Sequence, residues 1–284
     1  MINSYNPCNL CPHNCNSDRF SSTSGKCCSS AEMRIASYQP HFGEEPELVG
    51  SGGSGTIFFS GCSLRCVFCQ NYEISHEGRG EVISSDELVD IIFELQDYGC
   101  NNINFVTPTH YGPTIAAAIE QAKLNGLNIP TVWNSSCYEK VETLKSLEGL
   151  IDIYMPDIKF VKTENSSIYT IADNYFEFAS KAVLEMYRQV GDLHTVNGRA
   201  VSGMLVRHLV LPNNQGDTRA IIDFIADNVG TQTYLNLLDQ YHPAYKALSI
   251  SPLNKYLEPG EFEEYVDYAR SRGFKSPDYI YRSL

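Results

Sequence analysis

From Thr56 onward, the hydrophobic and polar positions divide the chain into short β-rich runs that alternate with stretches of helical periodicity. The β-rich runs are dominated by branched and aromatic residues, which favour extended backbone. The predicted strands are residues 56–60, 102–107, 131–134, 151–155, 203–211 and 233–238. The pattern therefore predicts six strands, each separated from the next by intervening sequence that is mostly helical.

The clearest predicted helix begins with a capping box, Ser84 to Glu87, and ends before Gly99. Its apolar face comprises Leu88, Ile91, Ile92 and Leu95. A second capping box, Ser136 to Glu139, predicts the start of another helix. Further helices are predicted at residues 113–125, 175–190, 217–229 and 261–272.

Alternation of strands and helices predicts an α/β fold with a parallel sheet and right-handed crossovers. Six such units form either a partial barrel or an open doubly wound sheet, and periodicity alone does not choose between them. In both topologies ligands bind at the carboxyl ends of the strands. Candidate functional residues are therefore judged by whether they follow a predicted strand.

Residues 1–50 differ from the rest of the chain. They contain five of the ten cysteines, many Ser and Asn residues and no sustained periodicity, which predicts an irregular segment shaped by metal or by docking. The boundary is placed in the run from Gly50 to Gly55, which is either a flexible linker or a loop that closely approaches other backbone. Residues 1–50 are thus predicted as a cysteine-rich segment with a possible metal site, and residues 51–284 as the portion that forms the partial barrel.

Composition limits the class of protein. The chain has 284 residues and a formal net charge of −13, which argues against a nucleic-acid binder held by phosphate neutralisation. No run approaches the ~20 apolar residues of a membrane helix, and residues 1–7 lack the features of a signal peptide. We expect a cytoplasmic protein without a membrane partner, in which clustered cysteines are reduced metal ligands rather than disulfides.

Three cysteines directly follow the first predicted strand. Cys62, Cys66 and Cys69 have the spacing Cys-x3-Cys-x2-Cys, with no obvious fourth ligand nearby. Four thiolates close a 4Fe-4S cluster, whereas three leave one iron open to a chelating substrate. The alternatives are a zinc site built from Cys66, Cys69 and two distant ligands, or a thioredoxin-like redox pair.

This motif, with Phe68 before its last cysteine, resembles the signature of the radical S-adenosylmethionine (SAM) superfamily. The resemblance covers about residues 55–243 and implies a partial (β/α)6 TIM-like barrel. It also implies a 4Fe-4S cluster whose free iron is chelated by SAM. One electron then cleaves SAM to methionine and a 5′-deoxyadenosyl radical, which abstracts hydrogen from a substrate.

Two further segments resemble the branch of pyruvate formate-lyase activating enzymes, which are activases of glycyl-radical enzymes. They are Cys69-Gln70-Asn71-Tyr72 and Met155-Pro156-Asp157-Ile158-Lys159. The resemblance implies an oxidoreductase with two kinds of partner, an external electron donor of flavodoxin or ferredoxin type and a glycyl-radical enzyme. Where activases carry a Gly-Gly-Glu motif for the SAM amino group, this chain has Thr107-Pro108-Thr109-His110.

Five residues are predicted to bind SAM, each near the end of a predicted strand: Thr107, Asn134, Ser135, Asp157 and Arg207. Thr109 is a further candidate beside Thr107. Asn134 and Ser135 could instead belong to a helix cap, for which Ser136 already suffices. Asp157 and Lys159 resemble the region where activases place a monovalent cation and contact substrate, and the alternative is a surface ion pair.

Arg207 lies within a predicted strand, so its guanidinium needs an anionic partner, and the resemblance makes that partner the SAM carboxylate. His208 is expected to face outward or into the core. Cys100 and Cys137 are interpreted as core residues. Tyr241 and His242 are expected to line a turn before Pro243, although the histidine could face the radical site.

A second group of cysteines lies near the N-terminus. Cys8, Cys11, Cys15 and Cys27 provide four thiols, enough to close either a zinc site or a complete 4Fe-4S cluster. We expect a second metal there, which orders a segment otherwise too polar to fold by burial. The segment would relay electrons or close the substrate mouth.

Three functions remain open at this point. The first is an activase that abstracts hydrogen from a glycine of a partner enzyme. The second is a radical SAM enzyme that modifies a small molecule or a peptide. The third is an iron-sulfur or zinc protein without catalytic activity, against which the open iron site and the unpaired Arg207 argue.

Overall fold

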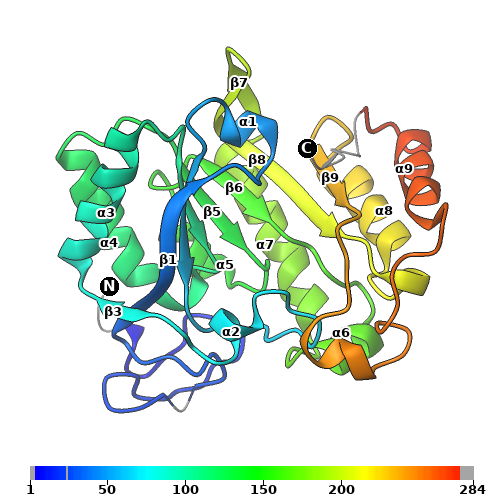
Figure 1. The fold of residues 1–284 in the computed structure, drawn as a ribbon, viewed down its shortest axis with the longest axis horizontal. Helices are drawn as coiled ribbons and strands as arrows, with labels where there is room; N and C mark the ends of the chain where they lie inside the picture. Colours follow the sequence, from blue (N-terminus) through cyan, green and yellow to red (C-terminus); the bar gives the residue numbers. More distant parts are fainter. Residues whose placement is uncertain (1–3, 24, 276–284) are drawn as a thin grey trace.

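The computed structural model describes residues 4–23 and 25–275, and a parallel sheet of six strands forms its centre (Figure 1). Each strand was predicted. In spatial order they are β2 (Ser54–Phe59), β4 (Ile103–Val106), β5 (Thr131–Ser135), β6 (Ile153–Pro156), β8 (Arg199–Leu209) and β9 (Tyr234–Leu238). Within the described residues β9 pairs only with β8, so the sheet is an incomplete barrel and not a closed one.

Three antiparallel strands extend this sheet. β1 (Met33–His41) pairs with β2, β3 (Glu81–Ile83) pairs with β1, and β7 (His194–Val196) pairs with β8. The prediction that residues 1–50 are irregular is therefore wrong for β1. Only two side chains of β1, those of Met33 and Ile35, are buried, so the strand forms through backbone pairing with β2 and leaves little hydrophobic alternation in the sequence.

The predicted long helices are present within two residues of their expected ends. They are α3 (Ser85–Tyr98), α4 (Gly112–Leu124), α7 (Tyr175–Val190), α8 (Thr218–Asn228) and α9 (Glu261–Ser271). The shorter helices are α1 (Pro46–Val49), α2 (Tyr72–Ser75), α5 (Val141–Lys145) and α6 (Thr163–Tyr169). The capping box of α3 is confirmed, because the Glu87 N–H donates to Ser84 Oγ at 3.1 Å and the Ser84 N–H donates to Glu87 Oε2 at 2.7 Å.

The second predicted capping box is wrong. Helix α5 begins at Val141 after Lys140, without a side-chain cap. Glu139 is fully buried instead, where its Oε1 accepts hydrogen bonds from Trp133 Nε1 and Thr109 Oγ1, each at 2.9 Å. The Glu139 carboxyl group therefore lies in the core and not at the start of a helix, and burial raises its pKa.

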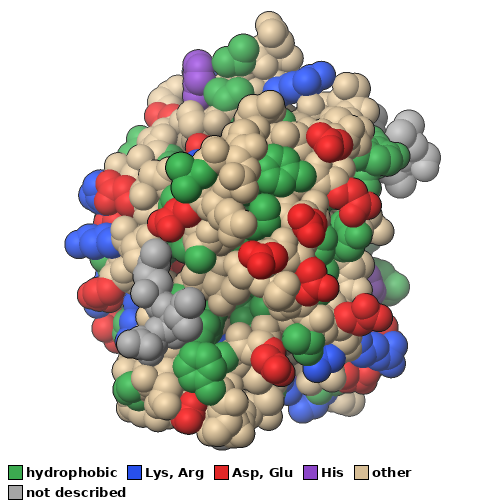
Figure 2. Space-filling model, turned by 90° about the vertical axis from the view of Figure 1, so that its left-hand side faces the viewer, with side chains coloured by type: hydrophobic (Ala, Val, Ile, Leu, Met, Phe, Trp, Pro, Cys, Tyr) green, Lys and Arg blue, Asp and Glu red, His purple; other side chains and the backbone are tan. Residues whose placement is uncertain are grey.

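The outer surface carries the acidic excess of the sequence. Figure 2 shows Asp and Glu side chains spread across one face, while Lys and Arg side chains lie mainly toward its margins. Among the described residues, no helix has both the length and the apolar character that crossing a membrane requires.

The glycine-rich run before β2 is a loop of close backbone approach and not a free linker. A Cβ atom added to Gly52 would lie 1.8 Å from the carbonyl oxygen of Gly99, at the end of α3. The backbone of Gly53 also accepts a hydrogen bond from the Asn101 N–H at 2.9 Å. The absence of side chains therefore lets this loop lie directly against the turn between α3 and β4.

His208 on β8 is a buried core histidine, as predicted. Its Nδ1–H donates to the carbonyl oxygen of Ile158 at 2.7 Å, and its Nε2 accepts from Thr218 Oγ1 at 2.9 Å. These bonds join the segment after β6 to the start of α8. Burial lowers the pKa of His208 to about 4, because the charged imidazole would lose its hydration.

We expect Gly52→Ala to lower the free energy of unfolding by about 1–3 kcal/mol, because the new methyl group overlaps backbone that cannot easily move. The matched control is Gly112→Ala, where the added Cβ would lie 3.7 Å from the Trp133 ring, at ordinary contact distance, and where helix α4 tolerates alanine. Urea unfolding followed by circular dichroism measures both. Equal stability of the two variants would contradict the close-approach interpretation.

We also expect stability to fall as pH decreases from 6.5 to about 4. Between these pH values His208 is protonated in the unfolded chain but stays neutral in the folded chain. This difference lowers the free energy of unfolding by roughly 3 kcal/mol at the acidic end of the range. His208→Gln should be less stable at neutral pH but show a shallower decline between pH 6.5 and 4. His194→Gln, on exposed β7, should follow the wild-type profile, and parallel profiles for all three proteins would refute the assignment.

Candidate active site

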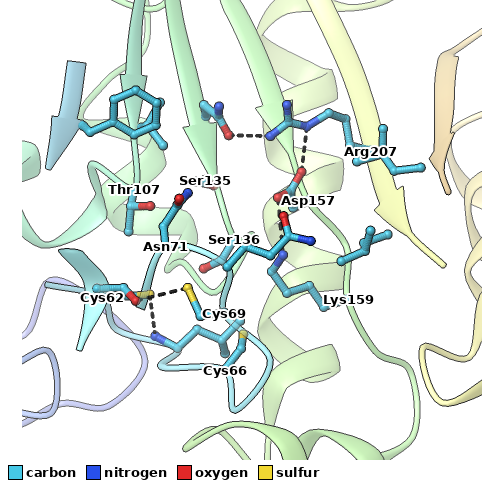
Figure 3. Close-up of a pocket in the computed structure, with 18 of the residues that line it drawn as sticks. Cys62, Cys66, Cys69, Asn71, Thr107, Ser135, Ser136, Asp157, Lys159 and Arg207 are labelled. Atoms are coloured by element: carbon cyan, nitrogen blue, oxygen red, sulfur yellow. Dashed lines mark hydrogen bonds and ion pairs between the residues drawn. The ribbon is translucent and has the colours of Figure 1, made fainter. Parts of the chain in front are cut away.

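A cavity of about 410 Å³ lies at the carboxyl ends of the parallel strands, and the three cysteines of the predicted cluster motif line it. Cys62, Cys66 and Cys69 belong to the loop that joins β2 to α2. Figure 3 shows their side chains grouped at one end of the cavity, near polar residues that follow the neighbouring strands. The chain thus brings the predicted cluster ligands and the predicted SAM-binding residues to one place.

Two of the thiols accept or share hydrogen bonds. The Leu64 N–H donates to Cys62 Sγ at 3.3 Å, and Cys69 Sγ lies 3.1 Å from Ser75 Oγ on α2. Burial raises the pKa of the Cys62 and Cys66 thiols. Without a positively charged partner these sulfurs would stay protonated, whereas a metal stabilises the thiolate form.

The remainder of the cysteine loop packs against the barrel. Phe68 is buried, with ring contacts to Phe160 and Tyr241 at centroid distances of 6.1 and 6.4 Å. The Val67 N–H donates to the carbonyl oxygen of Tyr169 at 2.9 Å. The positions of the thiols therefore depend on segments that follow β6 and β9, far away in the sequence.

The donor set fits an iron-sulfur cluster better than a mononuclear metal. Among the described residues, no group of three or more His, Cys, Asp or Glu side chains converges closely enough to hold one metal ion. The zinc alternative for Cys66 and Cys69 is therefore not supported. Thiols that hold a 4Fe-4S cluster lie farther apart, because each binds a different iron, and none of the described residues lining the cavity is a fourth cysteine.

All five residues predicted to bind SAM line this cavity, while their contact with SAM stays a prediction. Thr107 has a positive φ of 57°, which is costly for a β-branched residue, and its N–H donates to the Asn134 carbonyl oxygen at 2.9 Å. Ser135 Oγ accepts from the Cys137 N–H at 3.2 Å. Thr109 does not line the cavity, because the 3-10 turn after Pro108 directs it to buried Glu139.

Arg207 has its anionic partners within the protein. Its Nε donates to Asp157 Oδ1 and its Nη1 to Glu44 Oε2, both at 2.8 Å, while its Nη2 donates to Asn134 Oδ1 at 2.9 Å. The SAM carboxylate is therefore not required to neutralise this guanidinium, and the sequence argument that Arg207 would otherwise lack an anion is wrong. The same bonds hold Asp157 and Asn134 at the cavity wall. Figure 3 shows Arg207 beside Asp157 there.

Asp157 also pairs with Lys159, whose Nζ lies 3.3 Å from Asp157 Oδ2. The alternative of a surface pair is wrong, because their side chains are only 25% and 16% exposed and both line the cavity. Although burial opposes charge on each group, Arg207 and Lys159 lower the pKa of Asp157, and Asp157 raises that of Lys159. A positive Lys159 close to Cys66 favours the thiolate at that position.

Sequence reasoning missed Glu44 and Glu45, which lie between β1 and α1 and line the cavity from the side opposite the cysteines. Glu45 is 3% exposed, its Oε1 accepts from Asn236 Nδ2 at 2.8 Å, and its Oε2 has no hydrogen-bond partner. Burial raises its pKa, although Arg207 opposes the shift. Two acidic residues in a polar loop carry no periodicity, so nothing in the sequence marked them.

The remaining candidates fall where expected or at the margin of the site. Cys100 and Cys137 are buried in the core. Tyr241 is buried and donates to the carbonyl oxygen of Leu253 at 2.5 Å. His242 lies beside the cavity residue Gln70, whose Nε2 is 3.1 Å from His242 Nδ1.

Comparisons with known proteins agree with this geometry. The chain is 32% identical over 277 residues to an uncharacterized protein of Methanocaldococcus jannaschii, which covers 94% of this chain and 75% of that protein. A second uncharacterized protein of the same organism is 28% identical over 206 residues, covering 69% of this chain and 55% of its own length. Neither relative has an assigned activity.

The fold is similar to that of HydG, a maturase of the FeFe-hydrogenase. The TM-score is 0.50 at 14% identity, and the match covers 74% of this chain and 46% of HydG, so it supports the fold alone. The family model described as the Radical SAM superfamily matches residues 56–225, which include the cysteine loop and five of the six parallel strands, apart from the first two residues of β2. Family membership implies a 4Fe-4S cluster and SAM as cofactors, and the chain belongs to the radical SAM superfamily.

Proposed function

We propose that this radical SAM enzyme is an activase, which uses the radical generated from SAM to abstract hydrogen from a glycine of a partner enzyme. The observation that carries the proposal is the shared cavity, in which three thiols lie opposite the polar ends of parallel strands. The Cys69-Gln70-Asn71-Tyr72 and Met155-Pro156-Asp157-Ile158-Lys159 segments support the activase branch, and both contribute residues to the cavity wall.

The cysteines would hold the cluster, with one iron left for the amino and carboxylate groups of SAM. When bound, cluster and SAM supply a one-electron cleavage that yields methionine and a 5′-deoxyadenosyl radical. The chain's own contribution is binding and orientation. Asn134 and Ser135 offer short polar groups at the end of β5, and Lys159 offsets the negative charge of the thiolates.

Cavity size favours a substrate that reaches in from outside. Ligand pockets usually measure about 300–1,000 Å³, and this cavity of about 410 Å³ would be largely filled by a cluster and SAM. A glycine on a protruding loop of a partner needs little additional room. We place the approach of such a loop at the unclosed side of the sheet, where among the described residues β9 pairs only with β8. A flavodoxin or ferredoxin would supply the electron.

A second candidate function is the modification of a small molecule or peptide, and Glu45 is the observation that favours it. Glu45 lines the cavity, and its buried Oε2 lies 4.0 Å from Arg207 Nη1 but has no hydrogen-bond partner, which suits a substrate amine or hydroxyl group. A protein that never cleaves SAM is the remaining alternative. Calorimetric binding of SAM to the reconstituted protein would exclude a pure electron carrier or zinc scaffold.

We expect the anaerobically reconstituted wild type to convert SAM to 5′-deoxyadenosine and methionine when a strong reductant is added. Cys66→Ala should lower the rate at least about a hundredfold, because it removes one of three cluster ligands. Cys28→Ala, at an exposed cysteine outside the cavity, is the control and should retain the wild-type rate. Mass spectrometry measures 5′-deoxyadenosine, and equal yields from all three proteins would refute the site assignment.

The activase proposal is tested with a candidate glycyl-radical enzyme labelled with deuterated glycine. We expect a glycyl-radical signal in electron paramagnetic resonance and deuterium in the 5′-deoxyadenosine, because the hydrogen comes from the glycine α-carbon. The control is the same partner with its radical-site glycine replaced by alanine. Deuterium-free product that forms only with a small metabolite would instead establish the second function.

A further inference from the structure

Four cysteines outside the active site come together in the folded chain. Cys8, Cys11, Cys15 and Cys27 line one small cavity between the N-terminal segment and the 3-10 turn after β4. Three of the four are buried and Cys15 is half-buried. Cys28, the next residue in the chain, is exposed and does not line this cavity, so the convergence is specific to the four.

This segment has little hydrophobic material to order it. Residues 8–23 and 25–32 contain no helix or strand of two or more paired residues, and the apolar cluster here consists of Tyr5, Cys8 and Leu10, with Ala31 packed against it. Fixing the backbone costs about 1–2 kcal/mol per residue, which this cluster alone does not offset. Small polar segments of this kind are usually stabilised by a metal or by disulfides, and all the cysteines here are free.

A buried cation lies beside the thiols. Arg19 is 1% exposed and donates to the backbone carbonyl oxygens of Ser29, Ser30 and His110 at 3.0, 2.6 and 2.5 Å. Its Nη1 lies 4.0 Å from Cys8 Sγ, and its guanidinium lies over the Tyr5 ring at 4.7 Å. Over the described ranges of the chain, no carboxylate forms an ion pair with it.

An arginine is always charged, and a buried charge without a counter-ion is strongly destabilising. Neutral carbonyl groups and an aromatic ring satisfy its hydrogen bonds and part of its electrostatics, but they provide no negative charge. Four thiolates that bind either a zinc ion or a closed 4Fe-4S cluster form a centre with a net negative charge. Such a centre would supply the missing counter-ion.

We infer that Cys8, Cys11, Cys15 and Cys27 bind a second metal as a tetrathiolate centre, with Arg19 as its counter-ion. Backbone N–H groups that donate to metal-bound thiolates stabilise such a centre, and the Lys26 N–H already donates to Cys15 Sγ at 3.3 Å. The four sulfurs do not converge on the distances of a single ion, and the same holds for the thiols of the active-site loop. Metal content distinguishes a zinc ion from a closed 4Fe-4S cluster at these four thiols.

The segment that carries the second group of cysteines packs against the loop that carries Cys62. A Cβ atom added to Gly61, which precedes Cys62, would lie 2.2 Å from Ser29 Oγ and 3.0 Å from the Cys27 carbonyl oxygen. His13 Nε2 donates to the Ser63 carbonyl oxygen at 2.7 Å. In Figure 1 the N-terminal segment lies beside the loop that leads to α2. The centre therefore fixes the backbone on both sides of Cys62.

We expect metal analysis of anaerobically purified protein to separate the two sites. The Cys8→Ala, Cys11→Ala double variant should lose about half of the iron if the centre is a cluster, or all of the zinc with no loss of iron if it is zinc. Cys28→Ala is the control and should match wild type. Equal iron and zinc in wild type and the double variant would overturn the inference, whatever the activity of either protein.

A second measurement needs no ligand substitution. In metal-replete wild type, alkylation followed by mass spectrometry should label Cys28 and leave the four cysteines unmodified, and a chelator should expose all four together. Unchanged protection after complete metal removal would contradict the inference, because burial alone would then explain it. Arg19→Met should speed metal loss to a chelator about tenfold or more, whereas Arg219→Met, at an exposed arginine, should not.

Discussion

Parallel pairing of β2, β4, β5, β6, β8 and β9 is the constraint on which the rest of the structure depends. Because parallel strands run in one direction, every segment that follows a strand emerges at the same edge of the sheet. Asn134 pairs with Val106 on one side and with Met155 on the other, which fixes the relative heights of three strand ends. The cysteine loop can contact polar residues from distant parts of the sequence only because this register holds.

Buried charge stabilises the same arrangement from within. Arg207 is held by carboxylates from two places, Asp157 at the end of β6 and Glu44 between β1 and α1. Burying each of these groups alone would be costly, and removing any partner would leave an uncompensated charge. The network therefore makes the β1 to α1 segment part of the cavity, although it lies outside the six strand-helix units.

Much of the fold and the centre of the site could be predicted from the sequence. Each strand of the parallel sheet has a dense apolar run, and α3 has a reciprocal capping box, so local signals agreed with the final structure. Cys62, Cys66 and Cys69 were recognisable because their ligand spacing is short-range. The failures at β1, Glu139 and Glu44 share a cause, since each depends on a partner that is distant in the chain: β2, Trp133 and Arg207 respectively.

The segment that carries Glu44 and Glu45 has a consequence for how such an enzyme diversifies. It enters from β1 and leaves through α1, at the opposite end of the strands from the cysteine loop (Figure 1), yet both acidic side chains reach the cavity. Exchanging this short connection alters the chemistry of the cavity floor and leaves the thiols in place. Such an exchange must keep a carboxylate at the position of Glu44, because Arg207 would otherwise lose one of its two closely paired anions.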